Sequence, residues 1–125
     1  MLVAPLGLAF MQVAASSLPC SGFYAYIPQD IEAEVGFSIE VQPTAIEVLW
    51  TDYDNMFARK NVQDDGSLRF NDGRGGPFFH LTCSSTGATL SIEADEYNGV
   101  RSYQLVRSDV DIWGIARARG WPVDE

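Results

Sequence analysis

Residues 88–107 read ATLSIEADEYNGVRSYQLVR, and the fold class follows from them. Apolar residues occupy every second position over residues 88–94, with polar residues between them, which is typical of a strand with one buried face. Residues 100–107 form a second candidate strand. Asn98 and Gly99, between the two, suit the positive φ angles of a type I′ turn, whose twist matches that of paired strands. This stretch therefore predicts a β-hairpin.

The same two-residue period extends upstream over most of the chain. Six further candidate strands span residues 23–27, 35–41, 46–51, 56–62, 68–70 and 78–84, which makes eight in all. The dipeptides Asp65-Gly66 and Thr86-Gly87 offer two more tight turns. Because short turns make consecutive strands antiparallel neighbours, residues 56–107 are expected to form an up-and-down meander. Pro43, between two strands, predicts a bend or a switch between sheets.

The alternation ends after residue 107, and the sequence SDVDIWGIARARGWP at 108–122 has a helical period. Ser108 is the expected N-cap, and Asp111 stands three residues later in the capping-box position. Gly120 is expected to end the helix. The side chains expected to pack on the sheet are Val110, Trp113 and Ala116. We therefore predict an all-β fold: an antiparallel meander barrel or flattened sandwich of about eight strands, with one C-terminal helix of about eleven residues that closes one side or mouth of the sheet.

The first 19 residues, MLVAPLGLAFMQVAASSLP, are apolar, and no charged side chain precedes Asp30. The apolar run and the small residues at 13–15 fit a signal peptide with an A-x-A-like cleavage site, although the basic n-region is missing. The alternative is that residues 1–19 are retained as a strand, or as an arm that packs on a neighbouring subunit. The run is too short and too interrupted for a membrane span. Residues 20–125 are expected to form a single β domain.

The two cysteines of the chain, Cys20 and Cys83, have 62 residues between them (83 − 20 − 1). Cys83 shares the apolar face of its strand, and Cys20 lies just before the first strand. In an oxidising compartment they are expected to form a disulfide, whereas in a reducing cytosol both would be buried thiols. We predict the disulfide, and with it a secreted or periplasmic protein in preference to a cytoplasmic or particle-associated one.

The charge of the chain excludes one class of partner. The formal net charge is −9, and residues 1–58 carry seven acidic residues without a single Lys or Arg. Affinity for nucleic acids comes mostly from Lys and Arg that neutralise phosphates, so a nucleic-acid partner is not expected. An anionic membrane surface is disfavoured for the same reason.

The run NDGRGGPFFHLTC at 71–83 combines a glycine-rich loop with the single histidine and a cysteine. No Lys-Ser/Thr pair follows the glycines, so a hairpin loop is predicted in place of a phosphate loop. His80 and Cys83 lie on opposite faces of their strand, too far apart for a nucleophile and its base. One histidine and two distant cysteines do not supply a zinc site, and the acidic loops do not match an EF-hand. The sequence thus predicts no catalytic residue, no metal and no cofactor.

Aromatic residues are the candidates for binding. Tyr24 and Tyr26 alternate with Phe23, Ala25 and Ile27, and they are expected either on the outside or beneath a covering layer. The strand period also places Phe78 and His80 outside. Trp50 and Tyr103 are expected inside, where their packing decides whether a barrel of this size holds a cavity.

These observations predict a small exported β-barrel binding module for an apolar ligand or a protein partner, without catalytic activity. Its candidate binding residues are Tyr24, Tyr26, Trp50, Phe78, His80 and Tyr103. The alternative is a structural or assembly subunit, a particle or appendage component, with residues 1–19 as a packing arm. An enzyme of unknown type is the third possibility. Either of the first two is compatible with an oligomer.

Overall fold

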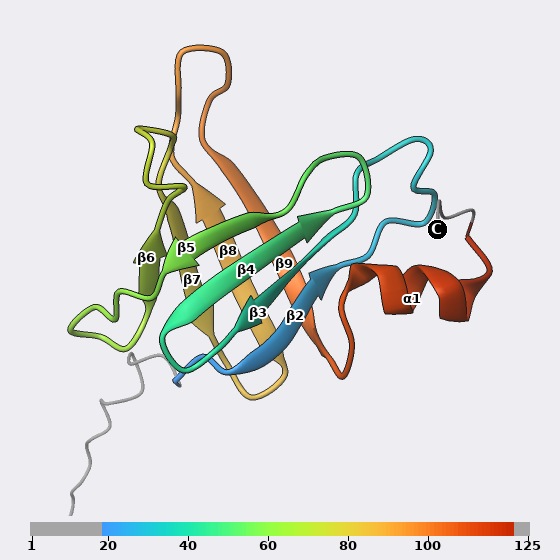
Figure 1. The fold of residues 1–125 in the computed structure, drawn as a ribbon, viewed down its shortest axis with the longest axis horizontal. Coiled ribbons are helices and arrows are strands. Elements are labelled where there is room, and N and C mark those ends of the chain that lie inside the picture. Colours follow the sequence, from blue (N-terminus) through green and yellow to red (C-terminus); the bar gives the residue numbers. More distant parts are fainter. Residues whose placement is uncertain (1–18, 122–125) are drawn as a thin grey trace, which may run out of the picture.

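The computed structural model describes residues 19–121, in which eight strands form one antiparallel sheet that curls into a nearly closed barrel (Figure 1). The strands are β2 (Gly22–Tyr26), β3 (Phe37–Val41), β4 (Ala45–Trp50), β5 (Met56–Arg59), β6 (Leu68–Phe70), β7 (Phe79–Cys83), β8 (Gly87–Ile92) and β9 (Arg101–Ser108), and they are followed by the helix α1 (Ile112–Arg119). The predicted fold class is confirmed, and each predicted strand is present. The predictions for residues 1–18 lie outside the described residues.

The order of strands in the sheet is β5-β4-β3-β2-β9-β8-β7-β6. Consecutive strands pair as hairpins on each side, and β2 joins the two halves by pairing with both β3 and β9. In the connection between β3 and β4, the amide of Gln42 donates to the carbonyl of Ala45 (2.9 Å). Of the two alternatives predicted at Pro43, the bend is present, and the switch between sheets is wrong because both strands stay in the same sheet.

The barrel has a seam between β5 and β6, which stand at opposite ends of the strand order. The predicted meander is broken here, because the chain changes partner at residues 60–61. The amide of Lys60 still donates to the carbonyl of Thr44 (3.2 Å), whereas the carbonyl of Asn61 accepts from the amide of Arg69 (3.1 Å). The turn at Asp65-Gly66 then reverses the chain as predicted, with Gly66 at φ 90°.

The barrel interior is filled by apolar side chains from the inner faces of all eight strands. Among the fully buried ones are Tyr24, Ile39, Ile46, Val48, Leu68, Phe70, Leu81 and Leu90. The sequence predicts Tyr24 either outside or beneath a covering layer; it is 0% exposed and belongs to the barrel core, so the outside position is wrong. Both faces of β2 are buried: its inner face lines the core, and Ala25 on its outer face is covered by α1. This explains why the strand is apolar on both faces.

The predicted disulfide between Cys20 and Cys83 is present, and both residues are buried in the core. Their Cα atoms are 5.4 Å apart, and the bridge links the segment just before β2 to the last residue of β7.

The close approach of β8 and β9 depends on Gly87, the first residue of β8. A Cβ atom at this position would lie 2.1 Å from the carbonyl oxygen of Leu105, so only glycine lets β8 and β9 approach this closely.

The helix α1 packs on the outside of the barrel, against β2 and β4 (Figure 1). It starts later than predicted: its N-cap is Asp111, whose carboxylate accepts from the amide of Gly114 (2.9 Å). Ser108 instead accepts from the amide of Val110 within the preceding turn. The helix is therefore eight residues long. Within the described residues, no helix has the length and apolar character needed to cross a bilayer.

The buried face of α1 also differs from the prediction. Ile112 is fully buried and Val110 is 45% exposed, which excludes Val110 from the core. The amide of Ile112 donates to the hydroxyl of Ser38 on β3 (2.8 Å), and this buried contact fixes the start of the helix against the sheet. The helix covers one side of the barrel, as predicted.

Candidate functional site

A pocket of about 280 Å³ opens at one end of the barrel. Strand direction explains its composition: β3, β7 and β9 begin at this end, and β4 and β8 finish there. The disulfide lies at the opposite end, because Cys83 is the last residue of β7. We call this opening the mouth pocket, and it is lined by Val35, Phe37, Trp50, Asp52, Tyr53, Phe79, Leu90, Ile92, Arg101 and Tyr103.

The walls of the mouth pocket are rings in mutual contact. Phe37 and Tyr103 meet edge to face with centroids 5.2 Å apart, and Trp50 and Phe79 meet at 6.5 Å. Tyr26 supports the first pair, with its ring 5.6 Å from Phe37 and 5.1 Å from Tyr103. Edge-to-face and offset-stacked contacts are the arrangements that aromatic pairs prefer, and here they pack the rings of the wall against one another. Its surface is mainly apolar and suits a flat apolar group.

The hydroxyl of Tyr26 donates to the carboxylate of Glu34 at the rim. This hydrogen bond raises the pKa of Tyr26 above its ordinary value, and burial and the nearby negative charge act in the same direction. Tyr26 therefore stays neutral at physiological pH. Its ring packs against Phe37 and Tyr103, two of the rings of the pocket wall.

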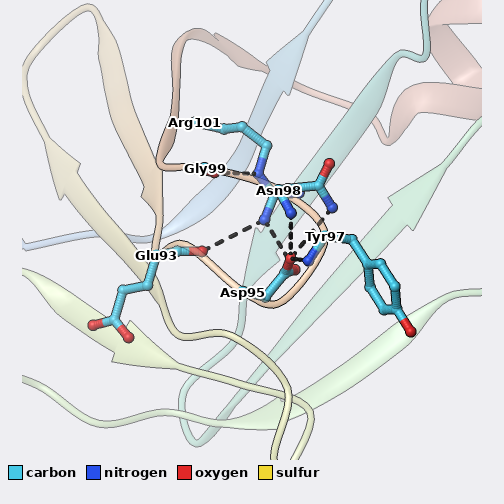
Figure 2. A network of polar contacts seen from close by, with 6 residues as sticks. All are labelled: Glu93, Asp95, Tyr97, Asn98, Gly99 and Arg101. Carbon is cyan, nitrogen blue, oxygen red and sulfur yellow. Dashed lines mark hydrogen bonds and ion pairs between the residues drawn. The ribbon is translucent and has the colours of Figure 1, made fainter.

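The charged residues of the mouth pocket are Asp52, just after β4, and Arg101, the first residue of β9. Arg101 is held by the β8–β9 connection, residues 93–100, which extends beyond the sheet (Figure 1). Figure 2 shows the contacts: Nε of Arg101 donates to the carbonyl of Gly99 (3.3 Å), and Nη2 lies 3.5 Å from the carbonyl of Glu93 and 3.4 Å from the Asp95 carboxylate.

Asp95 organises this connection, and the tight turn predicted at Asn98-Gly99 is wrong. The Asp95 carboxylate accepts from the amides of Tyr97 (2.9 Å) and Asn98 (2.7 Å), as Figure 2 shows. These backbone hydrogen bonds hold the pKa of Asp95 below its ordinary value, and the charge of Arg101 contributes less. Gly99 is not among the glycines at positive φ, so a type I′ turn does not form here.

Two of the six predicted binding residues, Trp50 and Tyr103, line the mouth pocket, and Tyr26 touches the ring of Tyr103. Tyr24 does not line the mouth pocket, and its hydroxyl accepts from Nη1 of Arg107 (2.9 Å) and from the amide of Ser21 (3.2 Å). The sequence did not single out Phe37, Phe79 or Arg101. Their common signal is that each lies at the first or second position of a strand beginning at the mouth.

Phe78 and His80 lie on the outer face, as predicted, and they are separate from the mouth pocket. Nε2 of His80 is 3.1 Å from the Glu93 carboxylate, which also pairs with Arg69 (3.3 Å). The contact with His80 is the main reason that the pKa of Glu93 lies below its ordinary value. The guanidinium of Arg69 also lies 3.6 Å from the centre of the Phe78 ring. The side chains of His80, Glu93 and Arg69 therefore find partners within this outer group of residues.

A wider hollow of about 500 Å³ adjoins the mouth pocket and shares Trp50 and Tyr53 with it. The rest of its lining comes mostly from polar residues of the 51–55 and 71–78 connections, so the smaller and more apolar mouth pocket is the better candidate site.

Within residues 19–121, no group of three or more His, Cys, Asp or Glu side chains is placed to hold a metal ion. Comparisons with protein families, curated proteins and solved structures find no match to this chain.

Proposed function

We propose that this protein is a non-catalytic β-barrel binding module that holds a small apolar ligand in the mouth pocket. The observation that carries this proposal is the aromatic wall formed by Phe37, Trp50, Phe79 and Tyr103 around about 280 Å³. Ligand sites are typically concave and mostly apolar, with a few polar groups that set orientation. At about 280 Å³ the pocket is slightly smaller than the usual range of roughly 300–1,000 Å³, and it therefore suits a ligand of one or two fused rings.

Export from the reducing cytosol is part of the same proposal. Disulfides form and persist in oxidising compartments, and the Cys20–Cys83 bridge supports a secreted or periplasmic protein. The apolar run and the small residues at 13–15 support export in the same way. Intact-mass measurement of the natively expressed protein tests this part: loss of the first residues supports export, and a full-length chain with two reactive thiols contradicts it.

Ligand binding is tested by calorimetric titration with 2-naphthalenemethanol, a neutral two-ring probe. We expect saturable binding of one probe per chain. Val35→Trp adds bulk to the lining of the pocket and should abolish binding, whereas Tyr97→Ser, on a side chain that is 86% exposed, should leave it unchanged. Circular dichroism of each variant establishes that the fold is retained. Absence of saturable binding by the wild type, or equal affinity in Val35→Trp, would contradict the proposal.

An assembly role is the second candidate, and it rests on the seam. Phe57 lies on β5, whose edge does not pair with β6, and it is 61% exposed. Val62, which pairs with Leu68 of β6 on the other side of the seam, is 62% exposed. Exposed edge strands with apolar side chains are sites where another chain can add a strand. Light scattering over a concentration series tests this role: association that Phe57→Ser abolishes would support it, and a monomer at all concentrations would exclude it.

A further inference from the structure

Arg101 is positioned by the barrel before any ligand arrives. Its side chain is 32% exposed, and its donors Nε and Nη2 are held by Gly99, Glu93 and Asp95. Within residues 19–121, the remaining nitrogen, Nη1, has no hydrogen-bond partner. The guanidinium belongs to the lining of the mouth pocket and is therefore a fixed cation with one free pair of N–H donors.

Asp95 forms an ion pair with Arg101 through one oxygen, Oδ2. Its other oxygen, Oδ1, accepts from the amides of Tyr97 and Asn98, at 2.9 and 2.7 Å. Its contact with Arg101 is longer, at 3.4 Å, and involves Nη2 only. The connection between β8 and β9 therefore orients the guanidinium and leaves one nitrogen available for a further acceptor.

The competing charge in the mouth pocket is Asp52. Within the described part of the chain, Asp52 has no hydrogen-bond or ion-pair partner, and its side chain is exposed. An exposed carboxylate without fixed neighbours loses side-chain freedom when it binds and remains screened by water, so it contributes little. A partly buried guanidinium that is already oriented loses less, and its interaction with an anion is screened less. The balance at the mouth therefore favours an acidic ligand over a basic one.

We infer that the mouth pocket selects ligands that join a flat apolar group to a carboxylate. The rings lie against the aromatic wall, and Nη1 of Arg101 donates to the carboxylate oxygen. This inference rests on the proposed function, because it names the chemical class of ligand for the same pocket. It assigns to Arg101 a role in specificity and gives a purpose to the 93–100 connection that holds it.

The test is a calorimetric titration of the wild type with three probes that share the naphthalene ring: 2-naphthoate, 2-naphthalenemethanol and 2-naphthylmethylamine. Charge-assisted hydrogen bonds are roughly twice as strong as neutral ones, so we expect 2-naphthoate to bind about tenfold more tightly than the alcohol, and the amine to bind more weakly than the alcohol. Equal affinity for all three would overturn the inference while the proposed function stands. Tighter binding of the amine would overturn it in favour of Asp52. Failure of all three to bind would overturn the proposed function itself.

Two variants assign the preference to a residue. In Arg101→Gln the ratio of the affinities for 2-naphthoate and the alcohol should fall to about one, with the affinity for the alcohol retained, because a charge-assisted hydrogen bond is lost and the aromatic wall is not. In the matched control Asp52→Asn, the preference for 2-naphthoate should persist. An unchanged ratio in Arg101→Gln would overturn the role of Arg101. The ratio is measured within each variant, and the wild-type series stands even if Arg101→Gln does not fold.

Discussion

Reduction of the Cys20–Cys83 disulfide should destabilise the barrel strongly. The bridge spans a sequence separation of 63 residues, and the chain-entropy treatment of a loop of this length gives about 4 kcal/mol of stabilisation. At a urea m-value of about 2 kcal/mol/M, this corresponds to a fall of about 2 M in the unfolding midpoint. This loss arises in the unfolded chain, which gains conformational freedom when the cross-link is removed.

The assay is urea unfolding, followed by tryptophan fluorescence, with and without a phosphine reductant. Thiol labelling of the denatured, unreduced protein should find no reactive cysteine, and after reduction it should find two. The double variant Cys20→Ala, Cys83→Ala is the control, since its midpoint should not respond to the reductant. A midpoint that shifts by less than about 0.5 M on reduction of fully bridged protein would refute the entropic argument.

Three further predictions concern packing and pH. Ile112→Ala should cost about 2–5 kcal/mol of unfolding free energy because Ile112 is fully buried between α1 and the sheet, whereas Val110→Ala, at 45% exposure, should cost less than about 1 kcal/mol by urea unfolding. Gly87→Ala should cost about 1–3 kcal/mol or more because the new Cβ meets the Leu105 carbonyl at 2.1 Å, and Gly99→Ala, where a Cβ meets nothing within 4 Å, should be close to neutral in the same assay. The pKa of Asp95 is lowered by backbone hydrogen bonds, so its contribution is complete above the ordinary value of 3.8 and is lost as pH falls through the folded value. The difference in unfolding free energy between wild type and Asp95→Asn should therefore shrink below pH 3.8, and a difference that stays constant down to pH 2 would contradict this.

Much of the sheet was predictable because apolar and polar residues alternate along short segments and turn residues separate several of these segments. The hairpin at Asp65-Gly66 follows from the preference of this dipeptide for tight turns. The disulfide follows from the position of Cys83 on the apolar face of its strand. The partner change at residues 60–61 was not predictable, because a bend that moves a strand from one neighbour to another leaves the alternation intact. The pairing of β2 with β9, which joins the two halves of the sheet, was likewise not visible in local pairing patterns.

The inner and outer faces of β2 were the hardest to assign. Tyr24 and Ala25 are both buried, Tyr24 in the core and Ala25 beneath α1, so alternation of polarity gives no preference there. The start of the helix was misplaced because Ser108 and Asp111 are both good caps, and the buried hydrogen bond from Ile112 to Ser38 decides between them. The mouth pocket depends on which strands begin or finish at the same end of the barrel, so Phe37, Phe79 and Arg101 could not be grouped from sequence alone.

The central claim is that the mouth pocket binds a small apolar ligand. Its most direct test is a nuclear Overhauser measurement on isotope-labelled protein with saturating 2-naphthalenemethanol. We expect contacts from the naphthalene protons to the rings of Trp50, Phe79 and Tyr103, which line the pocket. Contacts to Phe78 and His80 on the outer face instead, or no contacts to the protein at all, would contradict it.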